Sequence, residues 1–391
     1  MSDLGRGRRL VLLVTSLALL AAGLAVVATG GADKSVRAVT SSATTTTGPA
    51  LVAPVTPGTT LPEATLTPTT PTTAVAVTTA PSTTRPVTSG SPIGPVALTG
   101  CPPSHKPPAA TAPGHPAVLV PESALPAPPA AAPKVVDLAA LSGKGMWIWQ
   151  QNKTSGGSVD LIVRQAVGAG LRQVWVRVGS SLDGFYGQTW LNALVPALHR
   201  AGVAVIGWGF PYLYDPVADV AWTNQALTWR SPGGDRLDGW SADIETGSEG
   251  TALSGKRAAT YLGLVRPQMG GRPLIATVYP PTDYWLAHYP YQAMVPYIDA
   301  FAPMLYWSCV EPGAEATMAL QKLAGMAPVH LIGQAFDMGP YGGRDGSPSG
   351  AEIARFLDVA RRGGAKGASF WVWQYMTAPE WAALSAYPWR T

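Results

Sequence analysis

Two acidic residues, Asp243 and Glu245, are the side chains in this sequence whose type and spacing best fit catalysis. They end the stretch Leu-Asp-Gly-Trp-Ser-Ala-Asp-Ile-Glu, residues 237–245, which predicts a short buried strand. Side chains two positions apart on a strand share one face and lie about 6 to 7 Å apart. Two buried carboxylates shift each other's pKa, and this separates a proton donor from a charge stabiliser. The competing interpretation is an ordinary strand end whose acids are solvated in a loop.

An α/β barrel is the architecture that would place these acids at one end of a parallel sheet. Eight short apolar runs occupy the C-terminal part of the chain, at 145–150, 173–178, 203–210, 240–245, 274–279, 300–307, 329–336 and 368–374. Amphipathic segments lie between them, most clearly at 159–169, 190–201, 216–229, 255–269, 314–324 and 351–362. Apolar strands that alternate with helices predict a parallel sheet, and eight units in about 250 residues fit a (β/α)8 TIM barrel. A doubly wound sheet is the competitor, but no Gly-rich phosphate loop follows the first run.

Aromatic and polar side chains gather where these strands end, which is the end of a barrel that carries function. The candidates for contact with a substrate are Trp149, Arg177, Trp208, Tyr279, Tyr306, Gln334, Trp371 and Trp373. Further side chains at the same ends are Trp147, Tyr212, Trp307, Asp337 and Tyr375. Aromatic faces pack against sugar rings, while polar groups fix the hydroxyls. Since neighbours on a strand alternate faces, we expect about half of the aromatic side chains in the cleft and the rest in the core.

The fourth predicted strand resembles the signature of glycoside hydrolase family 18, the chitinase-like barrels, which reads Asp-Gly-x-Asp-x-Asp-x-Glu. The resemblance implies that Glu245 is the general acid and that Asp243 orients the N-acetyl group of the substrate. Asp238 matches the first Asp of the signature and is therefore a further substrate-binding candidate. Ser241 stands in place of the middle Asp.

The sixth and last strands are also similar to this family. Met304 and Tyr306 match the family's Met-x-Tyr-Asp, with Trp307 in place of the Asp. Trp371 or Trp373 resembles the closing Trp beneath the bound sugar, and the sequence leaves open which of the two aligns.

The domain resembles two other groups of barrels as well. The family 25 lysozyme-like muramidases carry Asp-x-Glu on the fourth strand, but their first-strand Asp is missing here, where the run reads Met-Trp-Ile-Trp-Gln, residues 146–150. The motif Gly-x-Gly-Met-Trp-Ile-Trp, residues 143–149, is similar to an actinobacterial group of hydrolase-like barrels. All three likenesses concern the C-terminal domain.

These resemblances imply a glycosidase for an N-acetylated glycan of a cell wall or cell surface. Glu245 would protonate the leaving oxygen, Asp243 would polarise the substrate's acetamido group as an internal nucleophile, and Tyr306 would donate a hydrogen bond. The alternative is a non-catalytic glycan-binding barrel at the cell surface, which the acids missing at Gln150, Ser241 and Trp307 favour. Arg177 has two open interpretations, as a clamp for a substrate carboxylate or as a counter-charge for Glu245.

Three parts of the chain differ in composition. Residues 1–35 carry Arg6, Arg8 and Arg9 before an uncharged run, which fits a cleaved signal peptide and a membrane anchor equally well and places the remainder outside the cytoplasm. Residues 36–135 are rich in Thr, Pro and Ala and predict a disordered linker, and residues 136–391 form the barrel domain. Cys101 in the linker and Cys309 in the domain either pair or stay apart.

Charge and histidine spacing argue against several other classes. The net charge of +4 is small and includes the N-terminal arginines, so we expect no nucleic-acid partner. His199, His288 and His330 lack metal-ligand spacing, so we expect no metal. Neither a phosphate-binding loop nor a nucleophile elbow occurs, and no cofactor is expected. We expect a monomer whose partner is a polysaccharide or peptidoglycan substrate.

Overall fold

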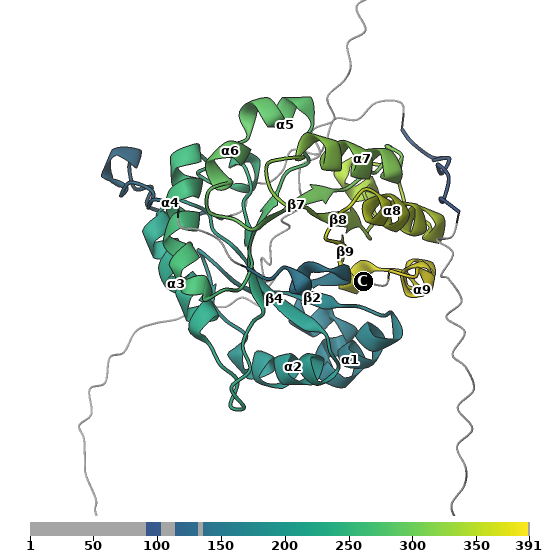
Figure 1. Ribbon diagram of the computed structural model, residues 1–391, viewed down its shortest axis with the longest axis horizontal. Helices are drawn as coiled ribbons and strands as arrows, with labels where there is room; N and C mark the ends of the chain where they lie inside the picture. The colour runs from purple at the N-terminus through teal and green to yellow at the C-terminus, as the bar shows by residue number, and fades with distance from the viewer. Residues whose placement is uncertain (1–90, 103–113, 132–135, 390–391) are drawn as a thin grey trace, which may run out of the picture. The chain divides into compact units, whose positions relative to one another are not determined.

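Eight parallel strands close into a barrel in the computed structural model, which describes residues 91–102, 114–131 and 136–389 (Figure 1). The strands are β1 (Gly143–Ile148), β2 (Gln173–Ser180), β4 (Ala204–Phe210), β5 (Gly239–Asp243), β6 (Leu274–Val278), β7 (Ala300–Leu305), β8 (His330–Gln334) and β9 (Gly367–Trp371). The ring closes because β1 pairs with both β2 and β9. A two-residue strand, β3 (Gly184–Phe185), pairs antiparallel with the end of β2. The predicted (β/α)8 fold is confirmed.

Helices surround the strands, as Figure 1 shows. Those that match the predicted segments are α1 (Val159–Gly168), α2 (Gln188–Arg200), α3 (Pro216–Thr228), α4 (Gly255–Val265), α7 (Pro312–Lys322) and α8 (Gly350–Arg362). Side-chain caps fix where several of them begin. Ser349 and Glu352 form a reciprocal capping box at the start of α8, and the Asp215 carboxylate accepts hydrogen bonds from two backbone N–H groups at the start of α3. Such caps stabilise a helix by about 1 kcal/mol.

Three short helices lie outside the predicted segments, namely α5 (Asp283–His288), α6 (Tyr291–Met294) and α9 (Ala378–Ala386). Each is too short for its apolar side chains to show a clear helical period. The capping residues of α5 and α9 are nevertheless present in the sequence. The Thr282 hydroxyl accepts from the Trp285 backbone N–H at 3.3 Å, and Glu380 accepts from the Thr377 backbone N–H at 2.6 Å.

Strand β5 ends at Asp243, two residues before the predicted end. The extended conformation continues for one more hydrogen bond, because Ile244 N donates to Thr277 O of β6 at 3.0 Å. Asp243 is also the register partner of Thr277. Both Asp243 and Glu245 therefore reach the carboxyl end of the barrel.

Parts of the predicted linker contact the barrel. In segment 91–102, the Ile93 backbone bonds to Asp358 and Arg355 of α8, and Cys101 forms a disulfide with Cys309. In segment 114–131, Val120 N donates to the backbone of the β4–α3 loop, and Pro129 O accepts from Tyr297 Oη at 3.0 Å. Figure 1 shows the two segments in dark blue, near α8 and α4 respectively.

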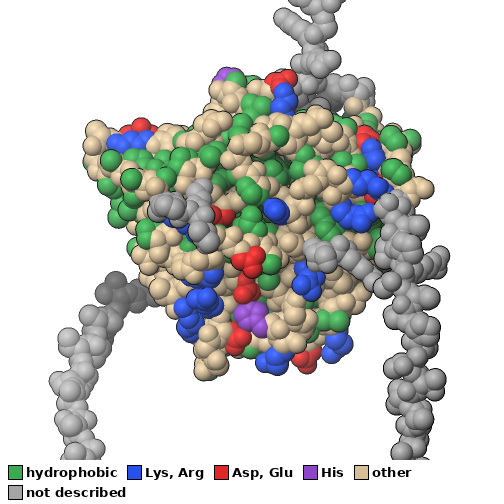
Figure 2. All heavy atoms as spheres, viewed as in Figure 1, with side chains coloured by type: hydrophobic (Ala, Val, Ile, Leu, Met, Phe, Trp, Pro, Cys, Tyr) green, Lys and Arg blue, Asp and Glu red, His purple; other side chains and the backbone are tan. Residues whose placement is uncertain are grey.

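The predicted signal or anchor segment, residues 1–35, and most of the predicted linker lie outside the described residues. Within the described ranges, none of the helices has the length and apolar character that a bilayer crossing requires. On the face drawn in Figure 2, Lys and Arg side chains lie in separate groups among acidic and apolar ones.

Aromatic side chains fill the barrel interior beneath the carboxyl end. The rings of Trp147 and Trp175 stack with centroids 4.7 Å apart, and His330 lies 4.8 Å from Trp175. Trp147 Nε1 donates to Ser369 Oγ at 2.8 Å, which fixes the indole in one orientation. Close packing of this kind provides a rigid floor for anything that binds above it.

Candidate active site

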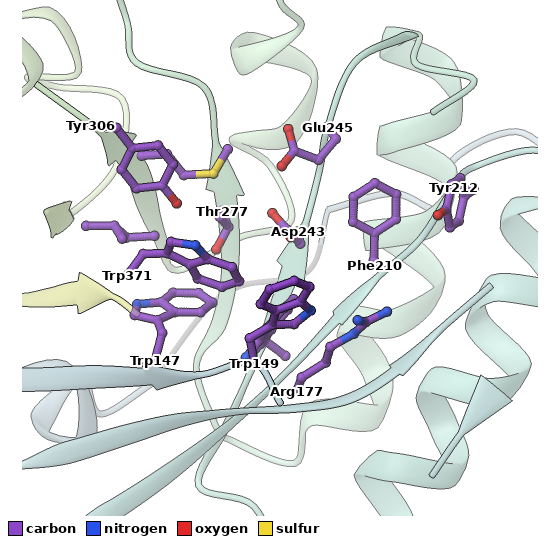
Figure 3. A pocket seen from close by; sticks show the side chains of 13 residues that line it. Trp147, Trp149, Arg177, Phe210, Tyr212, Asp243, Glu245, Thr277, Tyr306 and Trp371 are labelled. Carbon is purple, nitrogen blue, oxygen red and sulfur yellow. The ribbon is translucent and has the colours of Figure 1, made fainter. Parts of the chain in front are cut away.

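A pocket of about 530 Å³, including its open mouth, lies at the carboxyl ends of the strands. Figure 3 shows its walls, which are largely aromatic and surround two carboxylates. The lining side chains are Trp147, Trp149, Arg177, Trp208, Phe210, Tyr212, Asp243, Glu245, Thr277, Met304, Tyr306, Ile332 and Trp371.

Asp243 and Glu245 are the acids of this pocket, and both are almost completely buried, with 5% and 1% of their surface exposed. One oxygen of each, Asp243 Oδ1 and Glu245 Oε2, has no hydrogen-bond partner in the protein. The nearby Tyr279 hydroxyl acts to lower the pKa of Glu245, against the larger effect of burial. Because unpaired buried carboxylate oxygens cost about 1 to 3 kcal/mol or more, they mark atoms that are kept available for a ligand.

Burial raises the pKa of both carboxyls. For Glu245 the loss of hydration is the largest cause, and the negative charges of Asp243 and Glu249 add to it, so its pKa lies well above the usual value. For Asp243 the loss of hydration again outweighs the Arg177 guanidinium, which acts in the opposite direction. The two groups interact, so the proton of the pair belongs to both. The pair can therefore hold a proton near neutral pH, as a general acid requires.

Glu249 is a third acid near this pair and was not among the residues predicted from the sequence. It is 5% exposed and lies in the short helix Gly247–Glu249 that follows β5. Its Oε2 accepts hydrogen bonds from the hydroxyls of Thr246 and Ser248, both at 2.8 Å. The spacing Thr-x-x-Glu is a capping-box signature, so the sequence did contain a signal for its position.

Ser241, which replaces the middle Asp of the family 18 signature, lies beneath the two acids. Its Oγ is 2.8 Å from Thr277 Oγ1, and Thr277 lines the pocket. A pair of neutral hydroxyls therefore occupies the position where the signature has a charged group. Asp243 consequently has no acidic neighbour on that side.

Arg177 of β2 provides the positive charge among the pocket-lining residues. Its guanidinium lies over the ring of Trp208, with Cζ 5.8 Å from the centroid. The ion-pair partner that the structure gives it is Asp183, at 3.5 Å. Its Nε is buried and has no hydrogen-bond acceptor.

Three tryptophans form a connected wall around the pocket. The ring of Trp371 is 5.9 Å from that of Trp147 and 5.4 Å from that of Trp208. Trp208 is held in place by its Nε1, which donates to Ile148 O at 3.2 Å. Of the two candidates on the last strand, Trp371 is the one that lines the pocket. The sequence-predicted residues that the structure brings together here are Trp149, Arg177, Trp208, Asp243, Glu245, Met304, Tyr306 and Trp371.

Asp238 lies away from the pocket, contrary to expectation. It precedes β5, at the amino end of the barrel, and its Oδ2 accepts from Val205 N at 2.7 Å and contacts His199 Nε2 at 2.9 Å. Asp238 lies five positions before Asp243, an odd offset, so along a strand it faces the other way. Asp238 therefore links the start of β5 to β4 and to the end of α2.

Tyr279, Gln334 and Trp373 are near the pocket but do not line it. Tyr279 is fully buried, with its ring 4.4 Å from that of Trp285 in α5. The Gln334 side chain accepts from Ser308 N at 2.8 Å and donates to Phe336 O at 2.9 Å, which fixes the loop after β7. Trp373 packs edge-on against Trp381 of α9, 5.0 Å away.

Phe210, Thr277 and Ile332 line the pocket without having been candidates. Phe210 is two residues beyond Trp208 on the same strand, so the alternation of side chains would have placed it on the same face. Thr277 and Ile332 carry no feature in the sequence that distinguishes them from core residues. Within the described ranges, no group of three or more His, Cys, Asp or Glu side chains is arranged to hold a metal ion.

Solved structures similar to this chain include glycoside hydrolase barrels. A chitinase from Chromobacterium violaceum matches with a TM-score of 0.48 and 12% identity, over 64% of this chain and 100% of that one. The spore cortex-lytic enzyme SleL from Bacillus cereus matches with a TM-score of 0.46 and 12% identity, over 62% and 73%. A putative alpha-L-fucosidase from Bacteroides thetaiotaomicron gives 0.46 and 13%, over 64% and 92%. No family model and no curated protein matches the chain. At this level of similarity the likenesses carry no argument about activity, which has to come from the pocket.

Proposed function

We propose that this protein is an exported glycoside hydrolase that acts on an N-acetylated glycan of the cell wall or cell surface. The observation that carries the proposal is the pair Asp243 and Glu245, which is buried in an aromatic pocket with one oxygen of each acid unpaired. Glycosidic cleavage needs a proton donor and a group that stabilises positive charge at the sugar carbon. The surrounding tryptophan rings supply flat apolar faces for a sugar ring.

In the proposed reaction, the protonated Glu245 donates its proton to the glycosidic oxygen as the bond between that oxygen and the anomeric carbon breaks. The oxygen of the substrate's own acetamido group forms a bond to the anomeric carbon, while Asp243 accepts a hydrogen bond from the acetamido N–H. Water then attacks the anomeric carbon as the bond between that carbon and the acetamido oxygen breaks, and the water gives a proton to the Glu245 carboxylate, which restores the starting state. Substrate-assisted hydrolysis of this type is a known variant of the two-carboxylate scheme. Tyr306, at the pocket wall, is the proposed donor of a further hydrogen bond to the acetamido oxygen.

Location outside the cytoplasm is part of the proposal. The basic and then apolar start of the chain and its long Thr/Pro-rich stretch fit an exported protein that is either released or held at the membrane. The disulfide between Cys101 and Cys309 supports the same view, since disulfides persist mainly in oxidising compartments. We propose that the exported protein acts as a monomer.

The test is hydrolysis of chito-oligosaccharides and peptidoglycan fragments by the purified protein, followed as new reducing ends. We expect turnover that Glu245→Gln abolishes and that Asp160→Asn, an exposed substitution in α1, leaves unchanged. A glycan-binding barrel without activity is the second candidate, and the hydroxyl pair at Ser241 and Thr277 in place of a third acid favours it. If the unsubstituted protein and the Asp160→Asn variant bind the fragments saturably but release no reducing ends, the protein is a glycan-binding barrel instead.

A further inference from the structure

We propose that the pocket binds a sugar that carries a carboxylate, and that Arg177 is the residue that recognises it. The inference rests on the proposed function, because it names the substrate class of the same pocket. It concerns acidic glycans, whether the carboxylate belongs to a uronic acid or to a lactyl ether on an amino sugar. Neutral glycans such as chitin would then be the poorer ligands.

The Arg177 guanidinium has unused hydrogen-bonding capacity inside the pocket. Its Nε is buried without an acceptor, and only 14% of its side chain is exposed. Figure 3 shows the guanidinium extending into the space between Trp149 and Tyr212, below Asp243. A buried donor without a partner is costly, so its retention indicates that a ligand supplies the acceptor.

Asp183 forms only a weak, solvent-exposed ion pair with Arg177. The pair is separated by 3.5 Å, and the Asp183 side chain is 53% exposed. Asp183 is bound more closely to the Ser180 hydroxyl, at 2.8 Å, which holds it at the rim. Exposed pairs of this kind contribute little binding energy, so a substrate carboxylate can compete for the guanidinium.

Arg177 is poorly placed to serve as the counter-charge of the pocket acids, which is the alternative to binding a substrate carboxylate. No ion pair within 4.0 Å joins Arg177 to Asp243 or Glu245 in the described structure. The pKa of both acids is raised by burial, and the guanidinium opposes that rise only for Asp243, so Arg177 is not a close ion-pair partner of either acid. The positive charge of Arg177 is therefore left to an incoming anion.

The shape of the Arg177 guanidinium indicates that the incoming anion is a carboxylate. An arginine guanidinium presents parallel N–H donors that match the two oxygens of a carboxylate, and the Trp208 ring beneath it fixes its plane. The carboxylate must be attached to a sugar, because the rest of the wall is built from Trp149, Trp371 and other rings that fit a pyranose.

The test measures binding by calorimetry to the Glu245→Gln protein, in which hydrolysis does not interfere. The probes are chitotetraose, a tetrasaccharide of alternating N-acetylglucosamine and N-acetylmuramic acid with free lactyl carboxylates, the same compound with these carboxylates amidated, and a glucuronate-containing tetrasaccharide. We expect at least one carboxylate-bearing probe to bind about tenfold or more tightly than chitotetraose, as loss of a charge-assisted hydrogen bond implies. The probe that gains identifies the source of the carboxylate, and amidation should remove a lactyl preference.

A second substitution separates recognition from folding. In the Glu245→Gln background, Arg177→Gln should remove the preference while leaving the affinity for chitotetraose within about twofold, and Arg177→Lys should restore part of it, since Lys keeps the charge but not the fork. Arg200→Gln, at the exposed end of α2, is the matched control and should keep the preference. Melting temperatures confirm that each variant is folded.

The inference is overturned if the acidic probes bind no better than chitotetraose, or if Arg177→Gln weakens all probes equally. These outcomes are distinct from failure of the proposed function. A carboxylate preference without hydrolysis by the unsubstituted protein would leave a binding protein for acidic glycans, whereas hydrolysis without preference would leave the glycosidase and remove the role of Arg177.

Discussion

The two ends of the barrel treat buried polar groups in opposite ways. At the amino end, Lys144 Nζ donates to Leu384 O at 2.6 Å and to Tyr387 O at 2.9 Å. His330 contacts Leu141 O and Ser369 Oγ, both at 2.9 Å, so each of its ring nitrogens has a partner. The amino end therefore uses its polar groups to join segments that are far apart in the sequence.

At the carboxyl end, the buried charged groups are left partly unpaired. Asp243 Oδ1, Glu245 Oε2 and Arg177 Nε have no partner in the protein. Since folding alone would favour replacing such groups, the gathering of three of them in one pocket separates the part of the barrel that maintains the structure from the part that meets a ligand. We therefore expect substitutions at the carboxyl end to change kcat and substitutions at the amino end to change the free energy of unfolding.

The largest effect is expected for Glu245→Gln. Loss of the general acid should lower kcat by about 100- to 10,000-fold on a substrate with a poor leaving group. The free energy of unfolding should stay equal or rise, because a carboxyl with a raised pKa destabilises the folded state above the unfolded pKa. A pH series of urea unfolding would show this as a smaller loss of stability between about pH 4.5 and neutral pH than in the unsubstituted protein. A large loss of stability would contradict the comparison.

At the amino end, Asp299→Ala should show the reverse behaviour. Asp299 forms an ion pair with Arg266 and accepts from Leu274 N at 2.8 Å, and its side chain is 4% exposed. Its removal leaves Arg266 without its charge partner, so the free energy of unfolding should fall by about 3 to 5 kcal/mol. The kcat of the folded fraction, measured well below the melting temperature, should be unchanged. A fall in kcat of the Asp299→Ala variant under conditions in which it is fully folded would show that the two ends are coupled.

The disulfide is a stabilising link at the carboxyl end and so sharpens the comparison. It joins residues 208 positions apart, and its removal in a Cys101→Ser, Cys309→Ser double variant should lower the free energy of unfolding by about 2 to 4 kcal/mol. Thermal unfolding of the variant, with reduction of the unsubstituted protein as a parallel measurement, tests this. An unchanged melting temperature would mean that the disulfide contributes nothing to the stability of the barrel.

Glu249→Gln should change pH dependence more than rate. The Glu249 charge helps to raise the pKa of Glu245, so its neutralisation should lower that pKa. The alkaline limb of kcat/KM, where the general acid loses its proton, should move to lower pH. Gln can still accept the capping hydrogen bond, so stability should be nearly unchanged. Asp160→Asn serves as the control for a distant loss of charge, and an unmoved limb in Glu249→Gln would separate Glu249 from the site.

The smallest effect is expected for His199→Gln. Hydrogen bonds to Asp238, and to a lesser degree to Asp235, raise the pKa of His199 above its usual value. A raised histidine pKa contributes stability that is complete below the unfolded pKa of about 6.5 and is lost as pH rises through the folded pKa. The difference in unfolding free energy between the unsubstituted protein and the variant should therefore shrink as the pH rises above about 6.5. A constant difference would contradict this.

The sequence was sufficient for the barrel and for its central pair of acids, because both depend on local periodicity. Eight apolar runs define the strands, and the two-residue spacing places Asp243 and Glu245 together. The misplaced candidates have long-range causes. Tyr279 is covered by Trp285 of α5, and Trp373 by Trp381 of α9, two helices too short to predict. Asp238 matched a family pattern, but it is an odd number of positions from Asp243, so its side chain faces away from the pocket.

The link between Cys101 and Cys309 also has a mechanical consequence. Any pull applied to the chain on the N-terminal side of Cys101, while the barrel is held elsewhere, passes through the sulfur–sulfur bond directly into the loop after β7. The intervening chain, including strands β1 to β7, lies in a covalent loop that such tension cannot extend. A barrel attached in this way resists being unravelled from its first strand, and only the part beyond Cys309 can take up the load.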